Sequence, residues 1–85
     1  MSVTEIKERV HKELMDLDGN IGRLELTLHN KANRAIMSPH HWQLLTIQLV
    51  SMKTYAECLA ARLADFDEQL AQSLESSLEK PTEIP

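Results

Sequence analysis

The stretch LLTIQLVSMKTYAECLAARLADFDEQL, residues 44–70, decides the fold class of this chain. Apolar residues recur in it at alternating steps of four and three: Leu45, Leu49, Met52, Ala56, Leu59, Leu63, Phe66 and Leu70. This spacing places the side chains on one face of an α-helix, as a heptad-like seam that packs against another helix. The stretch therefore predicts a long amphipathic helix that needs a helical partner.

Signals at both ends set the length of this helix. In MSPHHWQ, residues 37–43, Ser38 is a suitable N-cap, and Pro39 takes the first helical position, where its missing N–H costs no hydrogen bond. Pro81 ends the pattern, because a proline disfavours helical geometry in the residue before it. Together these signals predict a helix over about residues 39–79.

A matching seam occupies the N-terminal third of the chain: Val3, Val10, Leu14, Leu17, Ile21, Leu24 and Leu28. Ser2 and Glu5 fit the S-x-x-E capping box, which starts a helix. We expect a first helix over about residues 3–29.

The segment DLDGNIG, residues 16–22, leaves two interpretations of that helix open. Asp18-Gly19 is a turn signal, yet the seam keeps its phase through the segment, which favours a continuous helix, kinked or straight. In a continuous helix, Gly19 and Gly22 would let another backbone or a ligand approach closely. The alternative role for the glycines is a locally weak stretch of helix.

Two helices with matched seams and a short connection at residues 30–38 predict an antiparallel hairpin. The fold class is therefore all-α: one helical hairpin domain over residues 1–80, with a frayed tail at 81–85. At 1.5 Å per residue the second helix reaches roughly 60 Å and the first roughly 40 Å, so the second overhangs the first.

The hairpin is expected to form a homo-oligomer with the second helix at its centre. A lone hairpin of this size buries little apolar surface, and the second helix carries another apolar strip beside its seam. That strip contains Leu44, Ile47, Val50 and Cys58, with Tyr55 nearby. The alternative is a marginally stable monomer.

Composition and charge exclude several classes of protein. The chain has 85 residues and a net charge of −4, and residues 64–85 hold six acidic side chains against Lys80 as their single base. Duplex DNA is not expected as a partner, because such proteins present a basic stripe. No apolar run approaches the roughly 18 residues of a membrane span. A single cysteine, Cys58, cannot form an internal disulfide and suits a reducing cytosol.

The residues give no reason to expect an enzyme, a metal site or a cofactor. His40 and His41 are adjacent, so on a helix they point about 100° apart and cannot readily chelate one ion. Cys58 lies on an apolar helical strip, where a thiol is usually inert. No glycine-rich phosphate loop is present.

Because neither catalysis nor metal binding is expected, we expect the function to be binding of a ligand or a partner. Lys53, Tyr55 and Arg62 lie in QLVSMKTYAECLAAR, residues 48–62. Tyrosine can stack on a nucleobase and arginine can hold a phosphate through two parallel hydrogen bonds. The alternative is that Tyr55 is an interface aromatic and Arg62 a solvated charge.

Residues 5–66 resemble small bacteriophage proteins built as helical hairpins, with a first helix like EIKERVHKEL and a second like LLTIQLVSMKTYAECLAARL. Residues 48–62 are similar to the second helix of the phage anti-CBASS hairpin proteins. The positions that correspond are Leu49, Tyr55, Ala56, Ala61 and Arg62. Tyrosine stands where that family has tryptophan, and the family's proline-bearing N-terminal segment has no counterpart here.

This resemblance implies a non-enzymatic anti-defence protein in the host bacterial cytoplasm. The anti-CBASS hairpin proteins form helical hexamers that sequester cyclic di- and trinucleotide immune signals without cleaving them. The resemblance implies a phosphate contact by Arg62 and a base contact by Tyr55, and we place Lys53 with them. One alternative is a protein-interaction module or inhibitor that binds a host defence protein through the second helix or the acidic C-terminal segment. Another is a structural assembly subunit.

Overall fold

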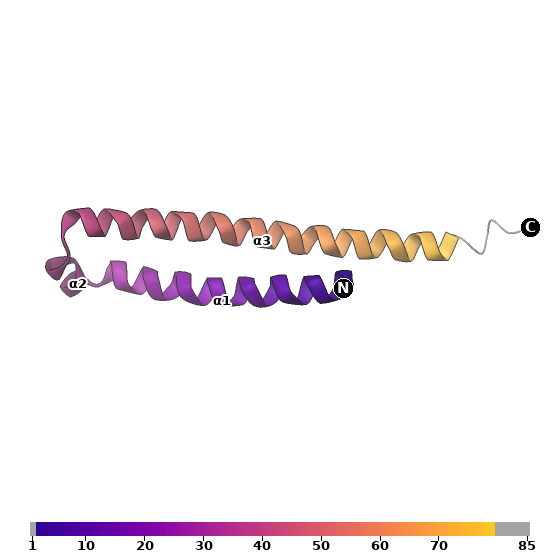
Figure 1. Cartoon of the computed structure of the whole chain (residues 1–85), viewed down its shortest axis with the longest axis horizontal. Helices are drawn as coiled ribbons and strands as arrows, with labels where there is room; N and C mark the ends of the chain where they lie inside the picture. The colour runs from indigo at the N-terminus through magenta and orange to yellow at the C-terminus, as the bar shows by residue number, and fades with distance from the viewer. Residues whose placement is uncertain (1, 80–85) are drawn as a thin grey trace, which may run out of the picture.

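The computed structural model describes residues 2–79, with side chains through residue 75, and this part of the chain is helical with no strand (Figure 1). The helices are α1 (Val3–His29), α2 (Lys31–Ile36) and α3 (Pro39–Glu79). The all-α class is confirmed, and the expected bounds of the two long helices match. The tail predicted at 81–85 lies outside the described residues.

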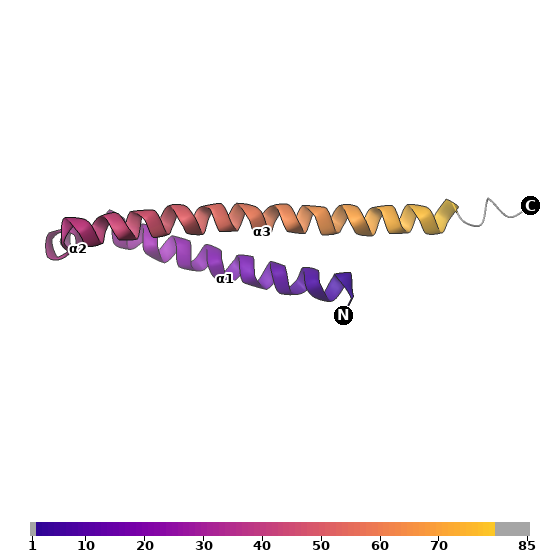
Figure 2. The ribbon, with the colours of Figure 1, turned by 45° about the horizontal axis from the view of Figure 1, so that its top comes forward.

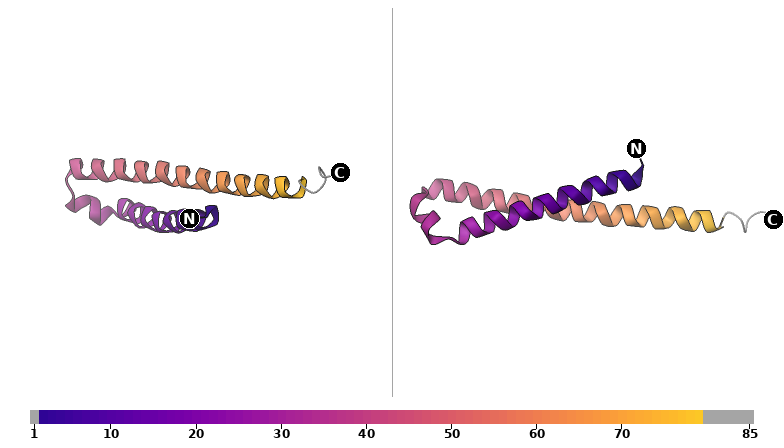
Figure 3. Two further views of the ribbon diagram at one scale, coloured as in Figure 1. Left: turned by 45° about the vertical axis from the view of Figure 1, so that its right-hand side comes forward. Right: turned by 90° about the horizontal axis from the view of Figure 1, so that it is seen from below.

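The two long helices lie side by side and run in opposite directions (Figures 1 and 2). Ion pairs between described residues join them: Lys7 contacts Asp67 near the start of α1, and the Lys53 ammonium lies 3.6 Å from the Glu25 carboxylate nearer its end. The helices cross when seen from below (Figure 3), and the last part of α3 extends beyond the N-terminal end of α1. The molecule is a rod: its radius of gyration is 20.6 Å, against about 12 Å for a globular domain of this length.

The core is one thin seam between α1 and α3. Val10, Ile21 and Leu59 are the buried apolar side chains of the described residues, at 3%, 8% and 0% exposure. The other seam positions are half-buried, as is Ile6, which the sequence pattern did not include. Leu70, predicted as a seam residue, is 37% exposed, one turn beyond Asp67, which pairs with Lys7 near the start of α1.

The connection differs from the sequence expectation, since a two-helix chain was predicted and a third, short helix forms. Asn30 adopts extended backbone angles (φ −87°, ψ 113°), which ends α1. Its side-chain oxygen then accepts a hydrogen bond from the Ala32 N–H at 2.9 Å, which caps α2. The Asn33 side chain donates to the Thr27 carbonyl at 3.2 Å and ties α2 back to α1. These contacts allow the chain to break and restart a helix within one residue.

The predicted helix starts are confirmed, and α1 is continuous through the glycines. The Ser2 hydroxyl accepts from the Glu5 N–H at 3.2 Å, and the Ser38 hydroxyl accepts from the His41 N–H at 3.1 Å. Neither glycine has a positive φ, so no turn forms at Asp18-Gly19. Packing of Leu17 and Ile21 against α3 stabilises this part of the helix, in keeping with the unbroken phase of the seam.

Leu59→Ala is expected to lower the free energy of unfolding by about 2–5 kcal/mol, because it removes a fully buried side chain from the middle of the seam. The matched control is Leu74→Ala, whose side chain is 63% exposed and should change stability by less than about 0.5 kcal/mol. Urea unfolding followed by circular dichroism at fixed protein concentration measures both. Equal effects of the two substitutions would contradict the packing described here.

Candidate functional site

Tyr55 and Arg62, two of the three residues predicted to bind a ligand, lie on the same flank of α3. They are seven residues apart, which is close to two helical turns. The Tyr55 hydroxyl donates a hydrogen bond to the Glu13 carboxylate of α1, and its side chain is 44% exposed. The Arg62 guanidinium lies over the Phe66 ring, 5.9 Å from its centroid. Each side chain is thus positioned by a neighbour and still accessible.

Lys53, the third predicted residue, lies on the opposite flank. A spacing of two residues separates Lys53 from Tyr55 by about 200° around the helix. The Lys53 ammonium contacts Glu25, whereas Tyr55 contacts Glu13. One hairpin therefore brings together Tyr55 and Arg62 but not Lys53. The spacing in the sequence already indicated this separation.

The electrostatics of the flank centre on Tyr55. The hydrogen bond to the Glu13 carboxylate raises the pKa of Tyr55 above 10.0, since removing the phenol proton would place two negative charges together. Slight desolvation and the charge of Glu13 add to the rise, and the positive charge of Arg62 opposes it. Tyr55 is accordingly a neutral hydrogen-bond donor at physiological pH. Glu13 was not foreseen, because its partner is 42 residues away in the sequence.

This flank offers chemistry for an aromatic and anionic ligand. An exposed tyrosine ring can stack on a base, and a guanidinium two turns away can bind a phosphate. Apolar side chains continue the same strip toward the start of α3, with Leu44 and Ile47 at 47% and 54% exposure. The outer surface of a single helix is convex, so it covers a ligand from one side only. A second surface is needed to enclose a ligand there.

A small hollow lies at the end of the rod where α2 connects α1 to α3. It measures about 160 Å³ and is lined by Arg34, Met37, Pro39 and Trp42. The Arg34 guanidinium lies 5.5 Å from the centroid of the Trp42 ring. His40 and His41 are exposed in the first turn of α3. Within residues 2–79, no group of three or more His, Cys, Asp or Glu side chains is arranged to hold a metal ion.

The family model named Sequestin matches residues 4–65 of this chain. The chain belongs to the Sequestin family. No curated protein and no solved structure matches it significantly. The Sequestin match confirms the similarity to the sponge-like hairpin proteins, and the family name fits a protein that sequesters a ligand rather than one that catalyses a reaction. The matched residues include Tyr55 and Arg62 and end before the part of α3 that overhangs α1.

Residues 2–79 contain no helical segment with the combined length and hydropathy of a membrane span.

Glu13→Gln is expected to lower the pKa of Tyr55 toward 10, and Arg62→Ala to raise it further, because the two neighbours act in opposite directions. Tyr55 is the sole tyrosine of the chain, so ultraviolet absorbance titration of the phenolate reports on it directly. Lys53→Ala, on the opposite flank, is the control and should leave the titration unchanged. Shifts of the same sign in both test variants would contradict the geometry of the flank.

Proposed function

We propose that this protein is a phage anti-defence protein that sequesters cyclic oligonucleotide immune signals in the cytoplasm of a bacterial host, without cleaving them. The observation that carries the proposal is the pairing of Tyr55 and Arg62 on one exposed flank, inside the segment matched by the Sequestin model. Cyclic di- and trinucleotides present bases and phosphates close together. An aromatic ring and a guanidinium on one helix face suit both groups.

The proposed pocket lies between subunits of a homo-oligomer. The Tyr55–Arg62 flank is open, and a neighbouring copy would supply the second wall. The apolar strip on α3 supports such an assembly, because Leu44, Ile47 and Val50 are between 47% and 60% exposed in the single chain. Lys53 faces away from Tyr55, so its ammonium would enter a pocket from the adjacent subunit. A hairpin with cationic groups on both flanks can serve two neighbours at once.

Arg62→Ala is expected to weaken binding of a cyclic dinucleotide or trinucleotide at least tenfold, since a hydrogen bond to a charged group contributes roughly 1.5–3 kcal/mol. The oligomer should survive, because Arg62 is an exposed polar side chain rather than part of the apolar strip. Native mass spectrometry with a panel of cyclic oligonucleotides gives both the assembly mass and the number of ligands bound.

The matched control for this experiment is Arg34→Ala, which removes the same charge at the turn. It should bind as the wild type does. Tyr55→Phe should retain the stacking surface and most of the affinity, whereas Tyr55→Ala should lose it. An Arg62→Ala protein that binds every ligand of the panel like the wild type would refute the proposed pocket. A wild-type oligomer that ignores the whole panel would refute the proposed ligand class.

The overhang of α3 favours a second candidate, a module that binds a basic host protein. Leu70 and Leu74 continue the seam beyond Asp67, which pairs with Lys7 near the start of α1, and are 37% and 63% exposed. Acidic residues accompany them, including Asp67, Glu68 and Glu75. An apolar stripe flanked by carboxylates suits a basic amphipathic helix.

Deletion of residues 70–85 separates the two candidates. It keeps Phe66 and the ion pair between Lys7 and Asp67, so the packed part of the hairpin is preserved. The sequestering function should be retained in full, because the truncated chain contains the whole segment matched by the family model. Loss of protection of the phage, with nucleotide binding intact, would instead favour the protein-binding candidate.

A further inference from the structure

Glu13 places a carboxylate at the hydroxyl end of the Tyr55 ring. The Tyr55 hydroxyl donates a hydrogen bond to this carboxylate, and both side chains are exposed on the flank that also carries Arg62. A carboxylate has about four lone-pair positions, and the hydroxyl uses one of them. Glu13 can therefore keep its contact with Tyr55 and still accept hydrogen bonds from a molecule that lies against the ring.

The flank has an acidic end and a basic end. Glu13 lies at Tyr55, and Arg62 follows Tyr55 by about 10 Å along α3, at about 1.5 Å per residue. A phosphate is attracted by the guanidinium and repelled by the carboxylate. A nucleotide bound to this flank would accordingly place its phosphate near Arg62 and its base on Tyr55. The spacing is comparable to that between the phosphate and the outer base edge of one nucleotide.

Hydrogen-bond chemistry decides which base suits a carboxylate at this position. A base that stacks offset on the Tyr55 ring projects its edge past the hydroxyl, where the Glu13 carboxylate lies. Guanine presents two adjacent donors on its Watson–Crick edge, N1–H and the N2 amino group, which match the two oxygens of a carboxylate. Adenine and cytosine present an amino group beside a ring-nitrogen lone pair, and uracil presents one N–H between two carbonyls. Each of these three bases would therefore turn an acceptor toward Glu13.

We propose that Glu13 makes the Tyr55 flank selective for guanine, so that this protein sequesters guanine-containing cyclic oligonucleotides in preference to those that carry adenine alone. The inference rests on the proposed function, since it requires a nucleotide on Tyr55. Glu13 accepts from N1–H and N2–H of the base, while Arg62 holds the phosphate. The negative charge of Glu13 disfavours every anionic ligand, and the two hydrogen bonds offset that repulsion for guanine alone, which is how a difference in affinity arises.

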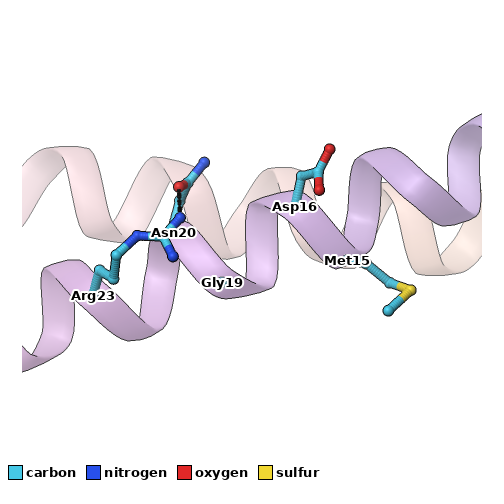
Figure 4. A pocket seen from close by; sticks show the side chains of 5 residues that line it. All are labelled: Met15, Asp16, Gly19, Asn20 and Arg23. Carbon is cyan, nitrogen blue, oxygen red and sulfur yellow. Dashed lines mark hydrogen bonds between the residues drawn. The ribbon is translucent and has the colours of Figure 1, made fainter.

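The neighbouring carboxylate of α1, Asp16, lies in different surroundings. It lines an open hollow of about 460 Å³ (Figure 4). The other residues that line this hollow also belong to α1: Met15, Gly19, Asn20 and Arg23. Asp16 therefore carries the same charge as Glu13, three residues along the same helix, without the contact to Tyr55. Substitution of Asp16 separates a loss of negative charge from a loss of base recognition.

Isothermal titration calorimetry of the full-length protein with cyclic diguanylate and cyclic diadenylate tests the proposal, because these ligands share one sugar–phosphate ring and differ only in their bases. The wild type should bind cyclic diguanylate at least tenfold more tightly. Glu13→Gln should abolish or reverse this preference, because a glutamine amide pairs one donor and one acceptor with adenine and opposes a donor to guanine. Glu13 is exposed, so the thermal midpoint should stay within a few degrees of the wild-type value.

Asp16→Asn is the matched control and should keep the preference for cyclic diguanylate in full. Equal affinity of the wild type for the two dinucleotides would overturn the selectivity. A preference that survives in Glu13→Gln, or that Asp16→Asn removes to the same extent, would overturn it too. The proposed function would stand in these cases, because a cyclic oligonucleotide still binds. A wild-type protein that ignores every cyclic oligonucleotide would instead refute the proposed function, and the guanine selectivity with it.

Discussion

The seam between α1 and α3 is the interaction on which the rest of the molecule depends. It buries Val10 and Ile21 of one helix against Leu59 of the other, and most other side chains of this thin rod keep contact with solvent. Two helices can cover only one face of each other. Each long helix therefore carries an outward surface, and both outward surfaces hold apolar residues. A third layer, supplied by other copies of the chain, would cover them without any change within the hairpin.

The same packing places the candidate binding residues of α3 on two flanks. With the seam turned toward α1, Tyr55 meets Glu13 on one flank and Lys53 meets Glu25 on the other. In each contact, a carboxylate of α1 holds a candidate binding residue of α3 in place. A ligand that competes for these side chains would have to offer its own acceptors, which phosphate oxygens do. The proposed cyclic-nucleotide ligand carries such acceptors.

The Sequestin match covers the part of the chain in which α1 and α3 pack together. It reaches residue 65 and leaves out the overhang of α3. The functional interpretation accordingly applies to the packed region, with its two flanks and two outward faces. The overhang differs in chemistry, since its apolar residues are exposed and its charges are acidic, and its role can be tested separately.

Local patterns in the sequence determined the helices of this protein. The seam spacing, Ser2, Ser38 and Pro39 predicted the class, the starts and the continuity of α1 through Gly19, because these signals act within one or two helical turns. The short helix after Asn30 was missed, since one asparagine both ends α1 and caps α2. Only the tertiary structure decided that Tyr55 meets Glu13, that Lys53 meets Glu25 and that Leu70 is uncovered. Those facts depend on the register and rotation of two helices far apart in sequence, which the spacing within either helix does not fix.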